Sequence, residues 1–403
     1  MINNENSILK IDDLITLNIE SIAHGGHFVA RHKGQVIFVR HAITDEIAIV
    51  KITSISNKLA FGDAIEIIKP SKDRITPLCK YSLVGNCGGC DFQHISIIAQ
   101  RKLKKFVIQD QFKRIAKIDI NTEIININPT SGLNWRTRFD FAISENKKIG
   151  LYSYKSNKVI EINECLIAVD AINKSDIFKL SWEGKERVRV SASSTNEVNI
   201  NRLGKNISGP IQLSENIKGN SYKISPGSFW QSHKNAPDIL IKKVLEFAKI
   251  KFGDCVCDLY GGIGLFTSPI LKIIRNSGKV HLIENDRNCI NDAREIFKEN
   301  KNVIIHNGKV EQKIGKIKNI DIVILDPPRN GAGKQVINQI IDKKPRSIIY
   351  VSCDPASLAR DTKILLNNSY KLENLIGIDL FPMTHHIECI ASYIKEEKKQ
   401  KYY

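Results

Sequence analysis

From Lys242 onward, the sequence repeats one pattern: a short apolar strand, a turn rich in glycine or proline, and a helical segment. The strand-and-turn segments read CVCDLYGGIGLF, KVHLIEND, VIIHNG, IDIVILDPPRNG and SIIYVSCDPASLARD. Strands that alternate with helices form a parallel, doubly wound sheet, because each helix returns the chain across the sheet before the next strand begins. Ligands of such a sheet bind at the carboxyl ends of its strands. The residues that follow each strand are therefore the first candidates for a functional site.

The N-terminal part of the chain follows a different period. Between Leu14 and Ile68, short apolar strands are separated by HGGH, RHKG and NKLAFGD, which favours a small β-barrel of the oligonucleotide-binding type. Alternation returns in WRTRFDFAIS and in the hairpin-like IGLYSYKSNKVIEINECLI. We therefore expect an α/β protein with a barrel over residues 1–70, a β-rich central domain over 71–225, and a Rossmann-like, doubly wound domain over 226–403.

Residues 95–117 are predicted to form a helix that packs on the C-terminal domain. Its apolar residues approximate helical spacing and are Ile98, Leu103, Phe106, Val107 and Ile115. Other positions are strongly basic, namely Arg101, Lys102, Lys104, Lys105, Lys113 and Arg114. Such a basic face fits either solvent or RNA.

The net charge restricts the partners of the chain. Sixty Lys and Arg against 43 Asp and Glu give a charge of +17, which favours a polyanion such as nucleic acid. An AT-rich genome, which enriches lysine, would produce the same excess. The N-terminal MINNENSILKIDD lacks the basic and apolar blocks of a signal peptide, and no run of about eighteen apolar residues follows. We expect a cytoplasmic protein with no membrane partner.

The turn DLYGGIG is a candidate cofactor site. Gly262 and Gly264 allow the backbone to pass close to a ligand before a helix begins. A dinucleotide fingerprint would need a third glycine where Thr267 stands, so a pyrophosphate cradle is not predicted. Glu284 lies at the end of the next strand, where a carboxylate can accept ribose hydroxyls. A ribose site without a pyrophosphate site points to S-adenosylmethionine.

Cys353 follows the strand SIIYVS and precedes Asp354 and Pro355, which favour the start of a helix. Backbone N–H groups and the helix dipole at this position should stabilise a thiolate. Cys353 is therefore a candidate nucleophile, although a cysteine is often an inert core residue. Asp326 ends the strand IDIVIL, and Asp-Pro-Pro could be only a rigid turn. Beside a cofactor site, we expect Asp326 to orient NH groups of the cofactor or substrate.

Glu388 begins an apolar strand just after His385 and His386. Adjacent histidines suggest a metal, but His-His-x-Glu on an extended strand does not reproduce the helical spacing of zinc proteases. General acid–base work fits better.

A second group of candidate ligands is the cysteines. Cys79, Cys87 and Cys90 lie in a glycine-rich loop, and Cys165 follows a strand-rich interval. With no export signal, these thiols are expected to be reduced. Four thiolates suit either an iron–sulfur cluster or tetrahedral zinc.

In order and separation, these motifs resemble the class I RNA uracil-C5 methyltransferases, especially members that modify 23S ribosomal RNA and carry an N-terminal TRAM barrel. The likeness covers nearly the whole chain, through the barrel, CGGCDFQH, SFWQSHKNA, DLYGGIGLF, IEND, DPPRNG, YVSCDPASLARD and FPMTHHIE. It implies Cys353 as nucleophile and Glu388 as base. The implied contacts to the cofactor and in the active site are Gln231, Tyr260, Glu284 and Asp326.

The implied chemistry explains these residue types. C5 of uracil becomes nucleophilic when a thiolate adds to C6; it then takes the methyl group of S-adenosylmethionine, and a base removes the C5 proton so that the thiolate can leave. The target base must be unstacked, and Phe229 or Trp230 could replace the lost stack or be core residues. The expected function is methylation of one uridine in 23S ribosomal RNA by a monomer. The alternatives are a tRNA uracil-C5 methyltransferase, a noncatalytic RNA-binding assembly factor, and an amino-group methyltransferase, which would not need Cys353.

The resemblance also selects a [4Fe-4S] cluster for the four cysteines, because relatives hold their ligands in this loop and in the matching INECLI strand. The cysteines lack the spacing of radical S-adenosylmethionine enzymes, so the expected role of the cluster is to hold the central domain and shape an RNA surface. Two features depart from the family. Seven residues separate Cys79 from Cys87, against about five in relatives. Lys309 stands where relatives commonly have an acidic residue near the adenine.

Overall fold

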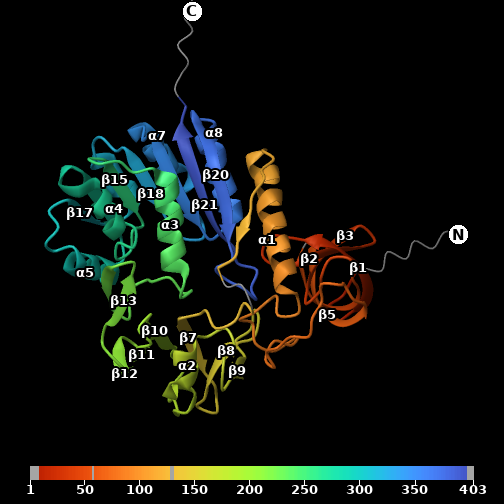
Figure 1. The fold of residues 1–403 in the computed structure, drawn as a ribbon. Helices are drawn as coiled ribbons and strands as arrows, with labels where there is room; N and C mark the ends of the chain where they lie inside the picture. Colours follow the sequence, from red (N-terminus) through yellow and green to blue (C-terminus); the bar gives the residue numbers. More distant parts are fainter. Residues whose placement is uncertain (1–8, 57–58, 128–130, 397–403) are drawn as a thin grey trace, which may run out of the picture. The chain divides into compact units, whose positions relative to one another are not determined.

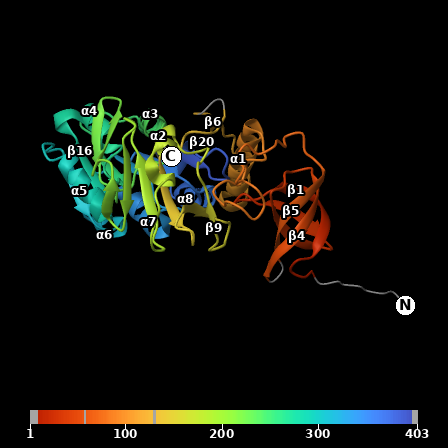
Figure 2. The same ribbon diagram turned by 90° about the horizontal axis from the view of Figure 1, so that it is seen from below.

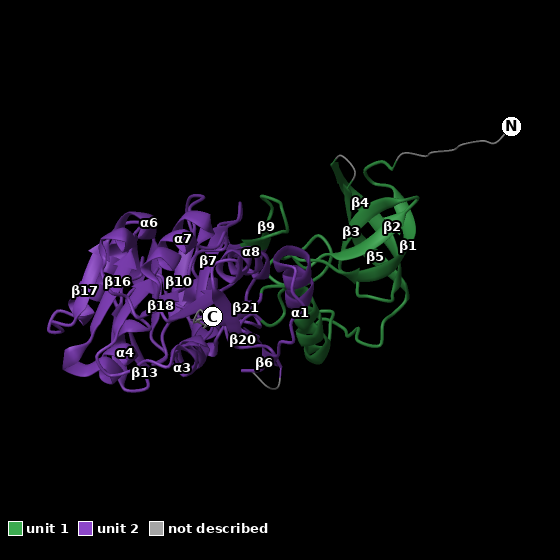
Figure 3. Cartoon of the chain, turned by 90° about the horizontal axis from the view of Figure 1, so that it is seen from above, with its two compact units in different colours: residues 1–107, 151–160, 382–386 green, residues 108–150, 161–381, 387–403 purple. Residues whose placement is uncertain are grey.

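The structure is a computed structural model, and it describes residues 9–56, 59–127 and 131–396. The chain forms two compact units (Figure 3). The first unit contains residues 1–107, 151–160 and 382–386, and the second contains residues 108–150, 161–381 and 387–403. Within the described ranges, no helix is both long and apolar enough to cross a membrane.

The first unit contains a closed five-stranded barrel with the strand order β1-β2-β3-β5-β4, which confirms the predicted N-terminal barrel (Figure 2). Its strands are β1 (Leu14–Ile22), β2 (Phe28–His32), β3 (Gln35–Arg40), β4 (Ile47–Ser56) and β5 (Leu59–Lys69). Alternate residues point inward: Ile37 and Val39 of β3 and Ala60 of β5 are fully buried. This period of two is what a strand with one face in a core requires.

A buried ion pair ties the cysteine-rich loop to the barrel. Arg74, at the start of this loop, donates from Nε and Nη2 to the two carboxylate oxygens of Glu46 at 2.6 and 2.7 Å. The same carboxylate accepts the backbone N–H groups of Ile43 and Ser71 at 2.8 and 3.0 Å. All of these bonds are charge-assisted, so the loop begins from a fixed point.

The segment 382–386 also belongs to the first unit and is held by the end of the cysteine-rich loop and by helix α1 (Ile97–Gln111). Asp91 Oδ2 lies 2.6 Å from Nδ1 of His385. Gln100 of α1 accepts the backbone N–H of Met383 at 2.9 Å.

The helix α1, followed by one turn of π-helix at Phe112–Ala116, agrees with the helix predicted over residues 95–117. The predicted apolar face is wrong at two positions, because Ile98 and Phe106 are exposed. Lys104, predicted on the basic face, is buried instead. A lysine can be covered along its aliphatic stem, so charge alone did not identify the buried face.

The central part of the chain forms a six-stranded sheet with the order β12-β11-β10-β7-β8-β9 (Figure 1). Its strands are β7 (Arg138–Ile143), β8 (Ile149–Tyr152), β9 (Val159–Glu161), β10 (Val188–Ala192), β11 (Val198–Arg202) and β12 (Lys205–Ser208). A two-stranded hairpin follows, made of β13 (Leu213–Ile217) and β14 (Asn220–Ile224). The short helix α2 (Asp170–Lys174) packs against β10.

The C-terminal part forms an eight-stranded sheet with the order β17-β16-β15-β18-β19-β21-β20-β6. The strands are β6 (Ile124–Ile125), β15 (Cys255–Leu259), β16 (Lys279–Glu284), β17 (Val303–Asn307), β18 (Ile322–Leu325), β19 (Ser347–Ser352), β20 (Tyr370–Ile378) and β21 (Glu388–Lys395). The helices are α3 (Ala236–Ala248), α4 (Thr267–Ile274), α5 (Arg287–Ile296), α6 (Val310–Lys313), α7 (Gly333–Lys343) and α8 (Pro355–Leu366). In two views α3 lies on one side of the sheet and α7 and α8 on the other (Figures 1 and 2). The predicted Rossmann-like sheet with helices on both faces is therefore confirmed.

One strand direction differs from the predicted parallel sheet. The pairs from β17 to β19 are parallel, but β21 runs antiparallel between β19 and β20. In this register Ser352 at the end of β19 pairs with Cys389 near the start of β21. The first residue of β21, Glu388, therefore lies at the carboxyl edge of the parallel strands, next to Cys353. An apolar pattern shows that a strand is buried but not in which direction it runs.

Candidate active site

The turn after β15 is built from backbone conformations that favour glycine. Gly262 and Gly264 have φ of +55° and +96°, and Tyr260 also has a positive φ of +59°. The turn is held to the strand by Asp258, whose Oδ2 accepts the hydroxyl proton of Thr267 at 2.7 Å. Thr267, noted in the sequence only as a missing glycine, thus has a structural task that a third glycine could not perform.

The two glycines are needed for different reasons. A Cβ on Gly264 would lie 2.4 Å from Cε2 of Phe297, so the helix α5 region packs directly on this backbone. A Cβ on Gly262 would meet no atom within 4 Å. Gly262 therefore supplies the left-handed conformation and leaves open space beside the turn.

Glu284, at the end of β16, binds the same turn. Its Oε2 accepts the backbone N–H of Gly262 at 2.9 Å. Its Oε1 accepts the N–H groups of Asn285 and Asp286 at 2.6 and 2.7 Å. Three donors fix the carboxylate, and the remaining lone pairs can accept hydrogen bonds from a ligand.

A pocket opens beside this turn. It is lined by Phe229, Trp230, Gln231, Tyr260, Gly261, Gly262, Ile263, Leu265, Phe266 and Asp326. Within this lining, Gln231 donates a hydrogen bond from Nε2 to Oδ2 of Asp326 at 3.5 Å. Four of the residues predicted to contact the cofactor therefore line one pocket: Gln231, Tyr260, Gly262 and Asp326. Gly264 lies in the neighbouring turn, and Glu284 accepts a hydrogen bond from that turn.

The two aromatic side chains before Gln231 have different environments. Trp230 is 4% exposed and packs with Tyr222 in the hydrophobic core, at a ring centroid distance of 5.2 Å. Phe229 is 62% exposed at the pocket. Of the two, Phe229 has the ring surface that a base could stack on.

Cys353 lies between β19 and α8, as its sequence context predicts. Asp354 is the N-cap of α8, because its side chain accepts the backbone N–H of Ser357 at 2.7 Å, and Pro355 is the first residue of the helix. Cys353 is half-buried at this junction. Its position beside the strand ends is set by these caps rather than by side-chain packing alone.

The surroundings of Cys353 oppose the charged form of its thiol. Burial, with the negative charges of Glu388 and Asp326, raises the pKa of Cys353 to about 12. The positive charge of Arg329 opposes this but does not prevail. With its pKa raised in this way, the side chain of Cys353 is a neutral thiol at physiological pH. Arg329 completes the Asp-Pro-Pro-Arg motif, but its sequence pattern alone does not single it out as a site residue.

Both carboxylates near Cys353 hold protons unusually tightly. Burial and the charge of Asp258 raise the pKa of Asp326 to about 7. Burial and the charge of Asp326 raise the pKa of Glu388 well above its usual value. Glu388 is 5% exposed, and among the described residues its Oε1 has no hydrogen-bond partner. A positively charged ligand would lower all of these pKa values, so this edge of the sheet suits a cation.

The cysteine-rich loop does not assemble a metal site in the structure. The sulfur atoms of Cys87 and Cys90 accept hydrogen bonds from the N–H of Gly89 at 3.4 Å and from Nε2 of Gln93 at 3.6 Å, as cluster ligands do. However, in the parts of the chain that the structure describes, no three His, Cys, Asp or Glu side chains are arranged to hold a metal. Cys165 belongs to the second unit. We therefore derive no step of the chemistry from a cluster.

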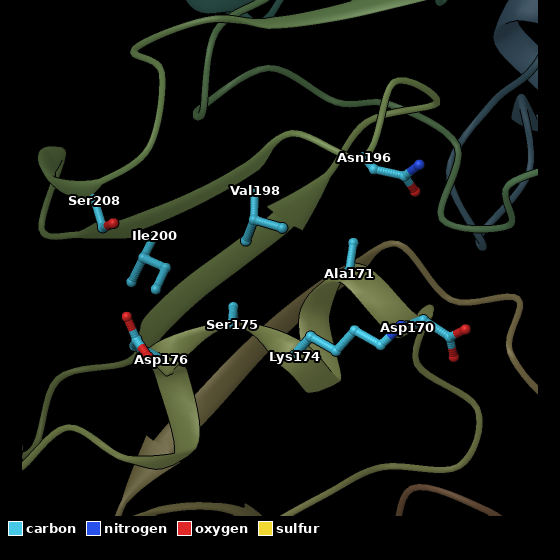
Figure 4. A pocket seen from close by; sticks show the side chains of 9 residues that line it. All are labelled: Asp170, Ala171, Lys174, Ser175, Asp176, Asn196, Val198, Ile200 and Ser208. Carbon is cyan, nitrogen blue, oxygen red and sulfur yellow. The ribbon is translucent and has the colours of Figure 1, made fainter.

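A second hollow lies in the central part of the second unit, between α2 and the strands β11 and β12 (Figure 4). Its lining is Asp170, Ala171, Lys174, Ser175, Asp176, Asn196, Val198, Ile200 and Ser208. None of the predicted site residues is among them, so the catalytic assignment stays with the pocket at the sheet edge.

Comparison with known proteins agrees with this geometry. The model of the tRNA (uracil-5-)-methyltransferase family matches residues 210–396, and that of the TRAM domain matches residues 13–65. An uncharacterized RNA methyltransferase of Streptomyces avermitilis is 34% identical, over 93% of this chain and 96% of its own. Another, of Caldanaerobacter subterraneus, is 30% identical over 95% of this chain and 98% of its own.

Among solved structures, the tRNA (uracil-54, C5)-methyltransferase of Pyrococcus abyssi, in complex with S-adenosyl-L-homocysteine, shares the fold. It covers 94% of this chain and all of its own, with a TM-score of 0.72 and 22% identity. With its barrel, its glycine turn and a cysteine and glutamate at the sheet edge, the chain belongs to the family of S-adenosylmethionine-dependent RNA uracil-C5 methyltransferases that carry an N-terminal TRAM domain.

Proposed function

We propose that this protein methylates C5 of one uridine in 23S ribosomal RNA, as a cytoplasmic monomer, through a covalent bond between Cys353 and the pyrimidine. The observation that carries the proposal is the meeting of Cys353 with the buried carboxyl group of Glu388, whose Oε1 has no hydrogen-bond partner among the described residues, beside the pocket of Gln231 and Asp326. An amino-group methyltransferase would need no thiol at this place. A noncatalytic RNA-binding factor would have no reason to keep a buried carboxyl group without a partner.

In the proposed mechanism, the Sγ atom of Cys353 adds to C6 of the uracil. Its proton must leave first, and the carboxylate of Asp326, whose charge acts on Cys353, is proposed to accept it, so that Glu388 stays available for the later step. When bound, S-adenosylmethionine supplies the methyl group and a positive sulfonium charge, which favours the thiolate and the carboxylates. After C5 has been methylated, Glu388 takes the C5 proton, the electron pair of that C–H bond restores the C5–C6 double bond, and the C6–S bond breaks to release the thiolate.

The cofactor contacts follow from the donors and acceptors of the turn. Glu284 is proposed to accept the ribose hydroxyls, since its carboxylate is already oriented by Gly262. Gly262 and Gly264 allow close approach of the backbone. Gln231, Tyr260 and Asp326 are proposed to contact the cofactor or the active-site ligands. Phe229 is proposed to stack on the unstacked base.

The choice of ribosomal RNA is supported by the TRAM barrel and the cysteine-rich loop, because tRNA-specific bacterial relatives generally lack both. A second candidate substrate is tRNA. It is favoured by the name of the matching family and by the archaeal enzyme of similar fold, which is a tRNA (uracil-54, C5)-methyltransferase. Methylation assays that offer protein-free 23S ribosomal RNA and tRNA transcripts side by side separate the two substrates.

We also propose that Cys79, Cys87, Cys90 and Cys165 bind a [4Fe-4S] cluster with a structural role. Support comes from the motif resemblance and from the hydrogen bonds to the sulfurs of Cys87 and Cys90. Anaerobically purified protein should contain iron and acid-labile sulfide. Stoichiometric zinc, or no metal at all, would overturn this part of the proposal.

The test of the chemistry is the variant Cys353→Ala. It should lose methyl transfer while still binding S-adenosylhomocysteine, because the pocket residues are unchanged. Cys255→Ala is the matched control, since Cys255 is a half-buried cysteine at the start of β15 that has no proposed role. Undiminished methyl transfer by Cys353→Ala would eliminate the covalent mechanism.

A further inference from the structure

The outer face of the barrel in the first unit carries a stacked pair of aromatic rings. Phe38 of β3 and Phe61 of β5 are register partners, and their rings stack with centroids 5.4 Å apart and planes inclined by 26°. Their strand neighbours Ile37, Val39 and Ala60 are buried inside the barrel, so strand alternation points the two phenylalanines outward. Both are half-buried, and each keeps part of its surface open to solvent.

Two further rings fix this pair in place. The ring of His27 meets Phe38 and Phe61 edge-on, with centroids 6.1 and 5.8 Å away. Its Nε2 lies 3.2 Å from the hydroxyl of Tyr154, in the hairpin that the first unit takes from residues 151–160. Burial is the main cause that lowers the pKa of His27 to about 4, so the ring is neutral at physiological pH. Phe38, Phe61, His27 and Tyr154 thus form an uncharged cluster of four rings, here called the platform.

The positive charge of Arg40, next to the platform, is neutralised by nearby carboxylates. The guanidinium carbon of Arg40 lies 3.5 Å from the ring centroid of Tyr154. The same guanidinium lies 4.0 Å from the carboxylates of Asp63 and Asp91. Arg40 therefore supports the ring of Tyr154 and contributes little net charge to the surface.

A second cation, Lys155, also lies against the platform, but no carboxylate among the described residues forms a salt bridge with it. The ammonium group of Lys155 lies 5.0 Å from the ring centroid of Phe61 and 5.4 Å from that of Tyr154. Lys155 is exposed and, within the described ranges, forms no salt bridge. The ammonium group lies over the ring of Phe61, so a base that stacks there takes its place and leaves the exposed lysine to the phosphate. Aromatic surface covered only by an exposed, unbalanced cation is a combination that single-stranded nucleic acids bind, through base stacking and phosphate attraction.

We propose that Phe38, Phe61 and Lys155 form a binding site for one nucleotide of single-stranded RNA. The base stacks on the phenylalanine pair, and its phosphate pairs with the ammonium group. The inference rests on the proposed function for RNA as the substrate and names the part of the barrel that binds it. The net charge of +17 is complementary to such a partner. Every base has a π-face, so the site adds affinity without selecting a sequence.

The test uses the full-length protein and its variant Phe61→Leu, which keeps an apolar side chain but removes the π-face. The probe is a short oligouridylate with one 2-aminopurine, whose fluorescence is quenched by stacking. Phe61→Leu should lose the quenching and bind about 5- to 150-fold more weakly, the range expected for one stacked base. Phe252→Leu is the matched control, because Phe252 is 64% exposed and belongs to the second unit.

Two more variants separate stacking from folding. Phe61→Tyr keeps an aromatic ring and should bind and quench like the parent. Lys155→Ala, at an exposed position, should lower the slope of log affinity against log salt by about 0.7, the value for one phosphate of a single strand. Should Phe61→Leu fail to fold, the salt slope of Lys155→Ala decides the question.

The proposal is overturned if the parent does not bind the oligomer, or if Phe61→Leu or Lys155→Ala binds it like the parent. A melting temperature that falls in Phe61→Leu with no change in RNA binding would assign the rings to packing of the hairpin, or to a protein partner. Failure of the proposed function looks different: the parent and its variants would show these binding differences, but no methyl group would reach 23S ribosomal RNA.

Discussion

The two units treat their buried carboxyl groups in opposite ways. In the first unit, Glu46 accepts four hydrogen bonds, two of them from Arg74. In the second unit, Glu388 keeps an oxygen with no partner among the described residues, and Asp326 has a long contact with Gln231. A buried charge without a partner costs free energy, and the folded chain avoids that cost by holding a proton instead. Glu46 is fully paired and holds the fold, whereas Asp326 and Glu388 are the carboxyl groups for which we propose a ligand.

Asp91 shows the same contrast through its pKa. Burial opposes its charge, as it does for Asp326 and Glu388. However, the hydrogen bond from His385 and the positive charge of Arg40 outweigh burial and hold the pKa of Asp91 below its usual value. Burial alone therefore does not decide the protonation state; the partners do.

The largest effect should come from replacing the unpartnered carboxyl group itself. Glu388→Gln removes the proposed base while keeping the shape of the side chain, so turnover should fall about 10²- to 10⁴-fold. The methylated RNA should accumulate as a covalent adduct that migrates with the protein on a denaturing gel. Glu373→Gln, which changes an exposed carboxylate of β20, is the control. Normal turnover, or loss of turnover with no trace of adduct, would remove Glu388 from the role of base.

The next effect concerns the paired carboxylate of the first unit, Glu46. Arg74→Met leaves the carboxylate of Glu46 buried without its cation, which should reduce the free energy of unfolding by about 3–5 kcal/mol. Urea denaturation measures this loss. Arg31→Met removes an exposed partner of Glu20 in the same barrel and should cost less than about 1 kcal/mol. Equal losses in the two variants would mean that pairing in the first unit is incidental to its stability.

Much of the fold and the positions of several site residues could be predicted from the sequence. The positions of Cys353, Asp326 and Glu284 at strand ends follow from local signals: an apolar run, a turn residue and a helix cap. These signals act within a few residues, so they are legible in one sequence. The alternation in the barrel is equally local.

The direction of β21 and the protonation state of its first residue, Glu388, could not be predicted. Strand direction depends on which strands become neighbours, and that is decided by the whole sheet. The protonation of Cys353 depends on Glu388 and Asp326, which come together only in the fold. The helix cap beside Cys353 is visible in the sequence, whereas the two neighbouring carboxyl groups are not.

A smaller effect, of opposite sign to that in Arg74→Met, should follow from Asp326→Asn. The pKa of Asp326 is raised from 3.8 to about 7. Between pH 3.8 and about 7, the folded chain keeps a proton on Asp326 that the unfolded chain releases. The stability that Asp326 contributes is therefore fully present below pH 3.8 and is lost as the pH rises through about 7. Without cofactor, the variant should be more stable than the parent at pH 8, by at most about 4 kcal/mol, since each pH unit between 3.8 and about 7 is worth up to about 1.4 kcal/mol.

This gain should shrink as the pH falls toward about 4, where the parent also carries the proton when unfolded. Urea denaturation at several pH values gives both numbers. Asp342→Asn, at an exposed position of α7, should leave stability unchanged at every pH. A variant that is less stable than the parent at pH 8 would show that Asp326 holds the fold, as Glu46 does, and would end the contrast between the units.

The smallest effect concerns two glycines with the same backbone cost but different neighbours. Gly262 in the cofactor turn and Gly34 in the barrel have φ of +55° and +82°, and a Cβ on either would meet no atom within 4 Å. Gly262→Ala and Gly34→Ala should therefore each lose about 1–2 kcal/mol of stability. Only Gly262→Ala should also weaken binding of S-adenosylhomocysteine in calorimetry, because the open space beside Gly262 is where the proposed cofactor lies and that beside Gly34 faces solvent. Equal cofactor affinity in both variants would mean that the ligand does not use the space beside Gly262, and the raised pKa values of Asp326 and Glu388 would then need another cation to explain them.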